Sequence, residues 1–124
     1  MCDDLCVKAS VLIVDDHPAF RASARSLLEG EGYEVVAETG SGESAVELAL
    51  ELAPDVVLLD VALPDLSGLE VAERLAESRS KVVLVSSRDP CDFGARFRRT
   101  SAVGFIPKDN LSGETLKELL EESS

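Results

Sequence analysis

The sequence predicts an α/β fold, a five-stranded doubly wound parallel sheet with helices on both faces. Five short apolar runs alternate with amphipathic runs along the 124 residues, which is the pattern of consecutive strand–helix units. Aromatic residues make up only 4% of the chain, and the apolar runs consist mainly of Val, Leu and Ile, as strands buried on both faces require. With 45% apolar residues the chain can bury the core of one domain. We expect a flexible N-terminal segment over residues 1–10 and a single domain over residues 11–122.

The first predicted strand and helix begin the domain. Val11–Val14 is a continuous apolar run typical of a buried strand. Pro18 suits the first turn of a helix that continues over Ala19–Glu29, and Gly30 and Gly32 are expected to end it. Helical spacing predicts that this helix packs on the sheet through Phe20, Ala24, Leu27 and Leu28.

A second strand–helix unit and the third strand follow. Tyr33–Glu38 reads as a strand, and a turn over Gly40–Glu43 leads into a helix that ends near Leu52. Its predicted inner face consists of Ala45, Leu48, Ala49 and Leu52. Pro54 breaks the chain before a strand over Asp55–Leu59.

The same alternation continues through the second half of the chain. In order, the predicted elements are a loop over Leu63–Gly68, a helix over Leu69–Glu77, a strand over Lys81–Val85, a short helix over Asp92–Thr100, a strand over Val103–Ile106 and a helix over Ser112–Glu121. Ser112 is the expected N-cap of the last helix, whose apolar stripe is Leu116, Leu119 and Leu120.

Charged side chains stand just beyond the ends of three of the predicted strands. Consecutive strand–helix units imply right-handed crossovers, and we expect the strand order 2-1-3-4-5, with its switch point between the first and third strands. Asp15 and Asp16 follow the first strand, Asp60 follows the third and Lys108 follows the fifth. Because the carboxyl ends of parallel strands share one edge, where ligands bind, we expect these four side chains to meet there.

This combination of residues suits phosphoryl chemistry at a divalent cation. Several carboxylates at close range repel one another, and Mg²⁺ relieves this because it prefers oxygen ligands and often bridges carboxylates to a phosphate. Asp60 could act as a nucleophile that forms an aspartyl-phosphate. Lys108 could neutralise charge on the transferring oxygens, and the hydroxyl of Ser86 could donate to one of them. His17, the single histidine, is expected to be an exposed neighbour of the acidic pair rather than a base or metal ligand.

Composition argues against several classes of partner and location. A net charge of −12 would repel a phosphate backbone, so direct binding to nucleic acid is not expected. No apolar run approaches membrane-spanning length, and the N-terminus lacks the basic residues of a signal peptide. The three cysteines, Cys2, Cys6 and Cys91, have no metal-ligand spacing, which favours reduced thiols in a cytoplasmic protein.

Four motifs together resemble the receiver domain of response regulators in two-component signalling. They are VLIVDDHP at 11–18, DVVLLD at 55–60 with Leu63, Pro64 and Gly68, VSS at 85–87 and GFIPK at 104–108. The resemblance extends from about Val11 to Leu120, nearly the whole chain. It implies the flavodoxin-like strand order named above. The residues around Asp16–Pro18 and Lys108–Ser112 look most like receivers of regulators that carry a helix-turn-helix output domain.

The resemblance implies a role for each matched position. Asp60 would be the phosphate acceptor. Asp15 and Asp16 would bind Mg²⁺ together with Asp60 and the backbone carbonyl of Ala62. Ser86 and Lys108 would contact the phosphoryl group, and Phe105 would be the aromatic switch residue. A histidine kinase would be the donor. The fourth and fifth helices and the fifth strand would form the readout face, directed at an output domain or a downstream protein. Homodimerisation on activation stays open, and no catalysis beyond the domain's own phosphorylation and dephosphorylation is expected.

Three features depart from the family pattern. Leu63 replaces a frequent Met, which should be mild. The segment Arg88–Thr100 is short for a fourth helix and contains Pro90 and Gly94, which puts the signalling face in doubt. No output domain follows Ser124, so we expect either a stand-alone receiver or an excised domain.

Two other classes of function share parts of this pattern. A haloacid-dehalogenase-type phosphohydrolase also forms an aspartyl-phosphate, but its general acid would stand where this chain has Ala62. A flavin-binding module has a similar topology, but Asp15 and Asp16 would repel the phosphate that its first loop must bind. Turnover of p-nitrophenyl phosphate would indicate the first class, and flavin absorbance the second.

Overall fold

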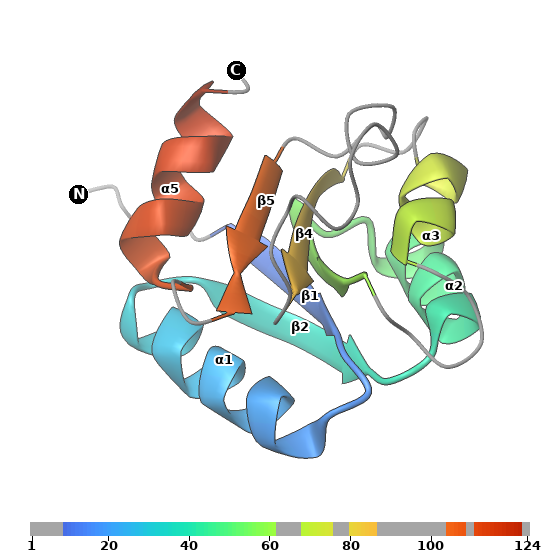
Figure 1. The fold of residues 1–124 in the computed structure, drawn as a ribbon, viewed down its shortest axis with the longest axis horizontal. Helices are drawn as coiled ribbons and strands as arrows, with labels where there is room; N and C mark the ends of the chain where they lie inside the picture. Colours follow the sequence, from blue (N-terminus) through green and yellow to red (C-terminus); the bar gives the residue numbers. More distant parts are fainter. Residues whose placement is uncertain (1–8, 62–67, 76–79, 87–103, 109–110, 123–124) are drawn as a thin grey trace.

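A five-stranded parallel sheet in the order β2-β1-β3-β4-β5 forms the middle layer of the molecule (Figure 1). The computed structural model describes residues 9–61, 68–75, 80–86, 104–108 and 111–122. The strands are β1 (Ser10–Val14), β2 (Glu34–Thr39), β3 (Val56–Asp60), β4 (Lys81–Ser86) and β5 (Gly104–Pro107). All four neighbouring pairs are parallel, so the predicted fold class and strand order are confirmed.

Helices cover both faces of the sheet (Figure 1). The helices α1 (Pro18–Gly30) and α5 (Gly113–Glu122) pack on one face, and α2 (Gly42–Leu52) and α3 (Gly68–Arg74) pack on the other. Within the described residues, no helix combines the length and the apolar character needed to cross a membrane.

The buried strands divide their side chains between two cores. In β1, Leu12 and Val14 pack toward α2 and α3, whereas Val11 and Ile13 pack toward α1 and α5, and all four are fully buried. Successive side chains of a strand point to opposite faces, so an unbroken apolar run is what a sheet covered on both sides requires.

Two predicted core residues proved to be on the surface. Leu27 of α1 is 36% exposed and Leu52 of α2 is 43% exposed, so their assignment to the inner faces was wrong. Leu27 lies beside the buried stripe of Ala24 and Leu28, because adjacent helical residues differ by about 100° around the axis. Leu52 is the last residue of its helix, which ends where Ala53 adopts a left-handed conformation (φ 47°).

Side-chain caps start two of the helices. Ser41 Oγ accepts a hydrogen bond from the Ser44 N–H (3.3 Å), and Ser112 Oγ accepts one from the Thr115 N–H (3.1 Å). Each bond satisfies a donor that the first turn of a helix leaves without a partner. The prediction that Ser112 caps the last helix is therefore confirmed.

One strand boundary differs in a way that affects the site. Asp60 was expected to follow the third strand, but it is the last residue of β3, where it pairs with Val85. The ladder continues because the Val61 N–H donates to the Val85 carbonyl (3.1 Å). Three of the predicted segments lie outside the described residues. They are the N-terminal residues 1–8, residues 62–67 of the predicted loop and the predicted short helix Asp92–Thr100.

Candidate functional site

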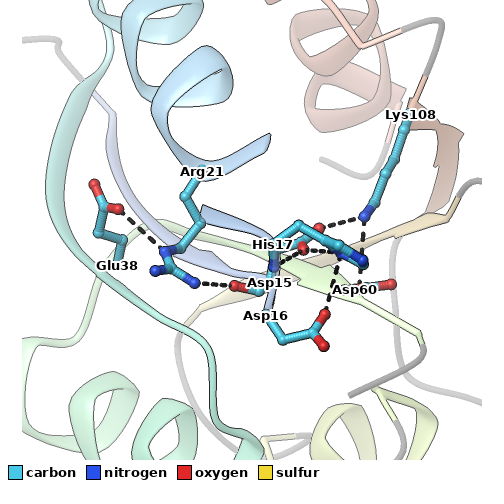
Figure 2. Close-up of polar contacts among 7 residues, drawn as sticks. All are labelled: Asp15, Asp16, His17, Arg21, Glu38, Asp60 and Lys108. Carbon is cyan, nitrogen blue, oxygen red and sulfur yellow. Dashed lines mark hydrogen bonds and ion pairs between the residues drawn. The ribbon is translucent and has the colours of Figure 1, made fainter. Parts of the chain in front are cut away.

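The carboxyl ends of β1, β3 and β5 bring an acidic cluster and one lysine together (Figure 2). Asp15 and Asp16 follow β1, Asp60 ends β3 and Lys108 follows β5. One carboxylate oxygen from each aspartate, together with a ring nitrogen of His17, lies within 4.8 Å of the others. The topology therefore assembles the four charged residues that the sequence placed at this edge.

Asp15 is the most enclosed member of this cluster. Its side chain has no solvent exposure, and its backbone N–H extends the sheet by donating to the Thr39 carbonyl (2.9 Å). Oδ1 accepts from the His17 N–H (2.8 Å), a local turn that aspartate favours. Oδ2 accepts no hydrogen bond within the described part of the chain, and Lys108 Nζ meets it as an ion pair at 2.5 Å.

Lys108 lies between two buried carboxylates and an aromatic ring. Its Nζ is 2.5 Å from Asp15 Oδ2 and 3.6 Å from Asp60 Oδ2, and the side chain is only 13% exposed. It also lies 4.5 Å from the centre of the Phe20 ring, within range of a cation–π attraction. The sequence predicted Phe20 only as a core residue, because helical periodicity carries no information on which ligand or ion a ring faces.

His17 lies at the mouth of the cluster. Its Nδ1 is 2.9 Å from Asp15 Oδ1 and 3.2 Å from Asp16 Oδ1, and its side chain is 66% exposed. Figure 2 shows the ring beside both carboxylates. The expectation that His17 is an exposed neighbour of the acidic pair is confirmed.

Two residues at the site were not predicted from the sequence. Arg21 of α1 donates from Nη1 to the backbone carbonyl of Asp15 (2.5 Å) and from Nε to Glu38 Oε1 on β2 (3.2 Å) (Figure 2). Glu38 also accepts from Arg25 (3.0 Å), which is 46% exposed. This hydrogen bond to Glu38, followed by one to Glu29, raises the pKa of the Arg25 guanidinium above its usual value.

Ser86 and Phe105, to which the resemblance to receiver domains assigns the switch, lie on the neighbouring strands β4 and β5. Ser86 ends β4 and is 3% exposed, so it stands at the same edge of the sheet as Asp60. Phe105 of β5 is half-buried against the core under α2 and α3, beside Leu84 in the strand register. Ala62, the expected carbonyl ligand, lies outside the described residues.

The residues present fit a hard divalent cation. Asp15, Asp16 and Asp60 would hold it, because Mg²⁺ prefers carboxylate oxygens and binds through one or two of them plus waters and phosphate. Oxygens from these three carboxylates lie within 4.8 Å of one another, which supports that fit. Three carboxylates against one ammonium leave an excess of negative charge that a cation would offset.

Relatives of this chain are bacterial response regulators. A family model described as the response regulator receiver domain matches residues 11–121. Response regulator GacA of Pseudomonas aeruginosa is 39% identical over 114 residues, which are 90% of this chain and 51% of GacA. The chain spans about half the length of the curated relatives it matches.

Solved structures with the same architecture are receiver domains and response regulators. The signal receiver domain of a modulated diguanylate cyclase from Desulfovibrio desulfuricans aligns with a TM-score of 0.82 at 32% identity, covering 94% of this chain and 93% of that one. A DNA-binding response regulator of the LuxR family from Staphylococcus aureus aligns at 0.81 and 26% identity, covering 92% and 97%. The chain therefore belongs to the receiver domain family and is the receiver domain of a two-component response regulator.

Proposed function

We propose that Asp60 accepts a phosphoryl group from a histidine kinase in a reaction that depends on Mg²⁺. The observation that carries this proposal is the position of Asp60, a 3% exposed carboxylate at the end of β3 that faces Lys108 and stands within 4.8 Å of Asp15 and Asp16. A nucleophile beside a fixed ammonium and additional metal ligands is the arrangement that phosphoryl transfer uses.

The proposed step is a displacement at phosphorus. An oxygen of the Asp60 carboxylate forms the new O–P bond while the P–N bond of a kinase phosphohistidine breaks, and the imidazole leaves with the bonding electron pair. Lys108 holds a positive charge against the oxygens of the transferring group, since its ammonium already lies 3.6 Å from Asp60 Oδ2. A bound Mg²⁺ would add charge neutralisation at the same oxygens.

A phosphohydrolase is the less favoured function. Such an enzyme needs an acid to protonate the leaving group, and the position two residues after Asp60 holds Ala62. We therefore expect no turnover of p-nitrophenyl phosphate, and the domain acts only on its own phosphorylation state. Sustained turnover that is lost in Asp60→Asn would favour the enzyme instead.

The site of phosphorylation can be identified directly. Borohydride reduces an acyl phosphate to an alcohol, so treatment of the phosphorylated domain should convert Asp60 to homoserine. Peptide mass spectrometry should find that conversion at residue 60 and leave Asp15 and Asp16 unchanged. Conversion at Asp15 or Asp16 in place of Asp60 would contradict the proposed acceptor.

The proposed consequence of phosphorylation is a switch in the β4–β5 region. The Ser86 hydroxyl moves toward the phosphoryl group, and the Phe105 ring turns into the space that this movement vacates. Such a local charge event can bias a two-state element and change a distant surface. NMR shift changes on phosphorylation should extend over β4, β5 and α5, and changes confined to β2 and α2 would contradict this switch.

The partners of this proposal are a histidine kinase and an output domain or downstream protein. The names of the relatives, including a DNA-binding response regulator, favour transcriptional output. A location in the cytoplasm and activation through homodimerisation belong to the same proposal. Sedimentation of the domain with and without phosphorylation would test the dimer, with one unchanged monomeric species as the contradicting result.

A further inference from the structure

The backbone carbonyl of Asp15 needs a partner that the sheet does not supply. The Asp15 N–H continues the ladder by donating to the Thr39 carbonyl, but β2 ends at Thr39. Beyond that end, the backbone N–H of Ser41 donates to the side-chain oxygen Thr39 Oγ1 (3.2 Å) and not to the Asp15 carbonyl. Arg21 Nη1 occupies that position instead, 2.5 Å from the Asp15 carbonyl oxygen. A buried carbonyl without a partner would be costly.

Arg21 is itself held in place by Glu38. The Arg21 side chain is 21% exposed, and its Nε lies 3.2 Å from Glu38 Oε1, whose side chain is 28% exposed. The planar guanidinium presents several donors in a fixed geometry, so one contact on β2 and one on the Asp15 carbonyl define its orientation. Figure 2 shows the side chain extended between these two partners.

Gly40 leaves the space that the guanidinium needs. A Cβ at position 40 would lie 3.1 Å from Arg21 Nη1, 3.3 Å from the Asp16 Cα and 3.5 Å from the Asp15 carbonyl oxygen. Its backbone is not in the left-handed region, so glycine is not required there for conformation. Close packing around the Asp15–Asp16 peptide is the remaining reason for a residue without a side chain.

We propose that Arg21, anchored by Glu38, is a positioning residue for the metal site, because it fixes the peptide that joins Asp15 to Asp16. This inference rests on the proposed binding of Mg²⁺. The Asp16 side chain is 36% exposed, so packing against neighbouring side chains does not enclose it. The position of its carboxylate therefore depends on the orientation of its backbone. Residues that orient metal ligands without touching the metal typically contribute about 10- to 100-fold to affinity.

The test is the affinity of the folded domain for Mg²⁺, measured by NMR titration with the metal alone. Arg21→Gln should raise the Kd about ten-fold, at the low end of that range, while the rate of phosphorylation at saturating Mg²⁺ stays within about two-fold. Arg25→Gln is the matched control, because it removes the other arginine contact of Glu38 without touching Asp15. It should leave the Kd unchanged.

A second variant tests the same idea without removing a charge. Gly40→Ala crowds the guanidinium and should also raise the Kd, whereas Gly30→Ala, where a Cβ meets nothing within 4 Å, should not. Because a Cβ at position 40 would also lie 3.3 Å from the Asp16 Cα, Gly40→Ala does not by itself isolate Arg21. If Arg21→Gln does not fold, Arg21→Lys, which keeps the charge but loses the planar set of donors, decides the question and should raise the Kd. Unchanged affinity in the folded variants, with wild type binding Mg²⁺, would overturn the role of Arg21 alone. Absence of Mg²⁺ binding in wild type would overturn the proposed function itself.

Discussion

The ammonium of Lys108 lies 2.5 Å from Oδ2 of Asp15, a carboxylate with no solvent exposure. The two residues are 93 positions apart, and the parallel sheet joins them because their strands end at the same edge. Asp60 shares the same ammonium at 3.6 Å. One cation among three carboxylates leaves the site short of positive charge.

Neutralising the proposed phosphate acceptor should stabilise the metal-free domain. Asp60→Asn removes one of three negative charges that lie within 4.8 Å. Two charges about 4 Å apart interact by about 4 kcal/mol at an effective dielectric constant near 20, and Lys108 compensates part of this. We expect a gain of about 1 kcal/mol, equivalent to about 3–6 °C in Tm by calorimetry in EDTA.

Glu47→Gln is the control for net charge, because Glu47 is an exposed residue of α2 and its removal changes the total by the same amount. Its Tm should stay within about 1–2 °C of wild type, as exposed charges contribute little. A Tm for Asp60→Asn at or below that of wild type would contradict the electrostatic description of the site.

Mg²⁺ should raise the melting temperature of the wild-type domain. The metal binds the assembled carboxylates of the folded state and not the dispersed ones of the unfolded chain, which adds about 1.4 kcal/mol at ten times the Kd. Asp15→Ala should abolish this increase, measured by thermal unfolding against Mg²⁺ concentration, and Glu47→Gln should retain it. An Asp15→Ala protein that responds as strongly as wild type would place the metal elsewhere.

Phe20 should influence Lys108 without influencing the metal. Phe20→Leu keeps an apolar side chain in the core but removes the ring 4.5 Å from Lys108 Nζ, a contact that contributes about 0.5–1 kcal/mol at exposed sites and more when desolvated. The phosphorylation rate at saturating Mg²⁺ should fall about two- to ten-fold, with the Kd for Mg²⁺ unchanged.

Phe20→Tyr keeps the ring and is the matched control, so its rate should remain near that of wild type. The result expected for Phe20→Leu, a lower phosphorylation rate with an unchanged Kd for Mg²⁺, is the reverse of the result expected for Arg21→Gln, which should raise the Kd and leave the rate at saturating Mg²⁺ unchanged. A Phe20→Leu rate equal to that of Phe20→Tyr would indicate that the ring serves packing only.

Much of the site could be predicted from the sequence because one topological rule controls it. Parallel strands place their carboxyl ends together, so Asp15, Asp60 and Lys108 could be assigned to one edge from three apolar runs and the first charged residue after each. The strand order 2-1-3-4-5 was expected as the flavodoxin-like form of a doubly wound sheet, and the structure confirms it. The predicted end of the third strand, Leu59, was one residue too early. Strand β3 includes Asp60 because its ladder with β4 continues to the pair Asp60–Val85.

The contacts between Arg21, Glu38 and the Asp15 carbonyl could not be predicted in the same way. Arg21 and Glu38 are 17 positions apart on a helix and a strand, and in sequence both look like ordinary surface charges. Their role depends on the crossing of α1 over the end of β2 and on the gap left by Gly40. No periodicity or motif encodes those distances, so only the three-dimensional arrangement reveals them.

The most direct test of the central claim is the intact mass of the domain after incubation with acetyl phosphate and Mg²⁺. The account predicts one labile adduct with the mass of a single phosphoryl group, absent in Asp60→Asn and absent when EDTA replaces Mg²⁺. Glu47→Gln should form the adduct as wild type does. A folded wild-type domain that forms no adduct, or an adduct that persists in Asp60→Asn, would contradict the assignment of Asp60 as the phosphate acceptor.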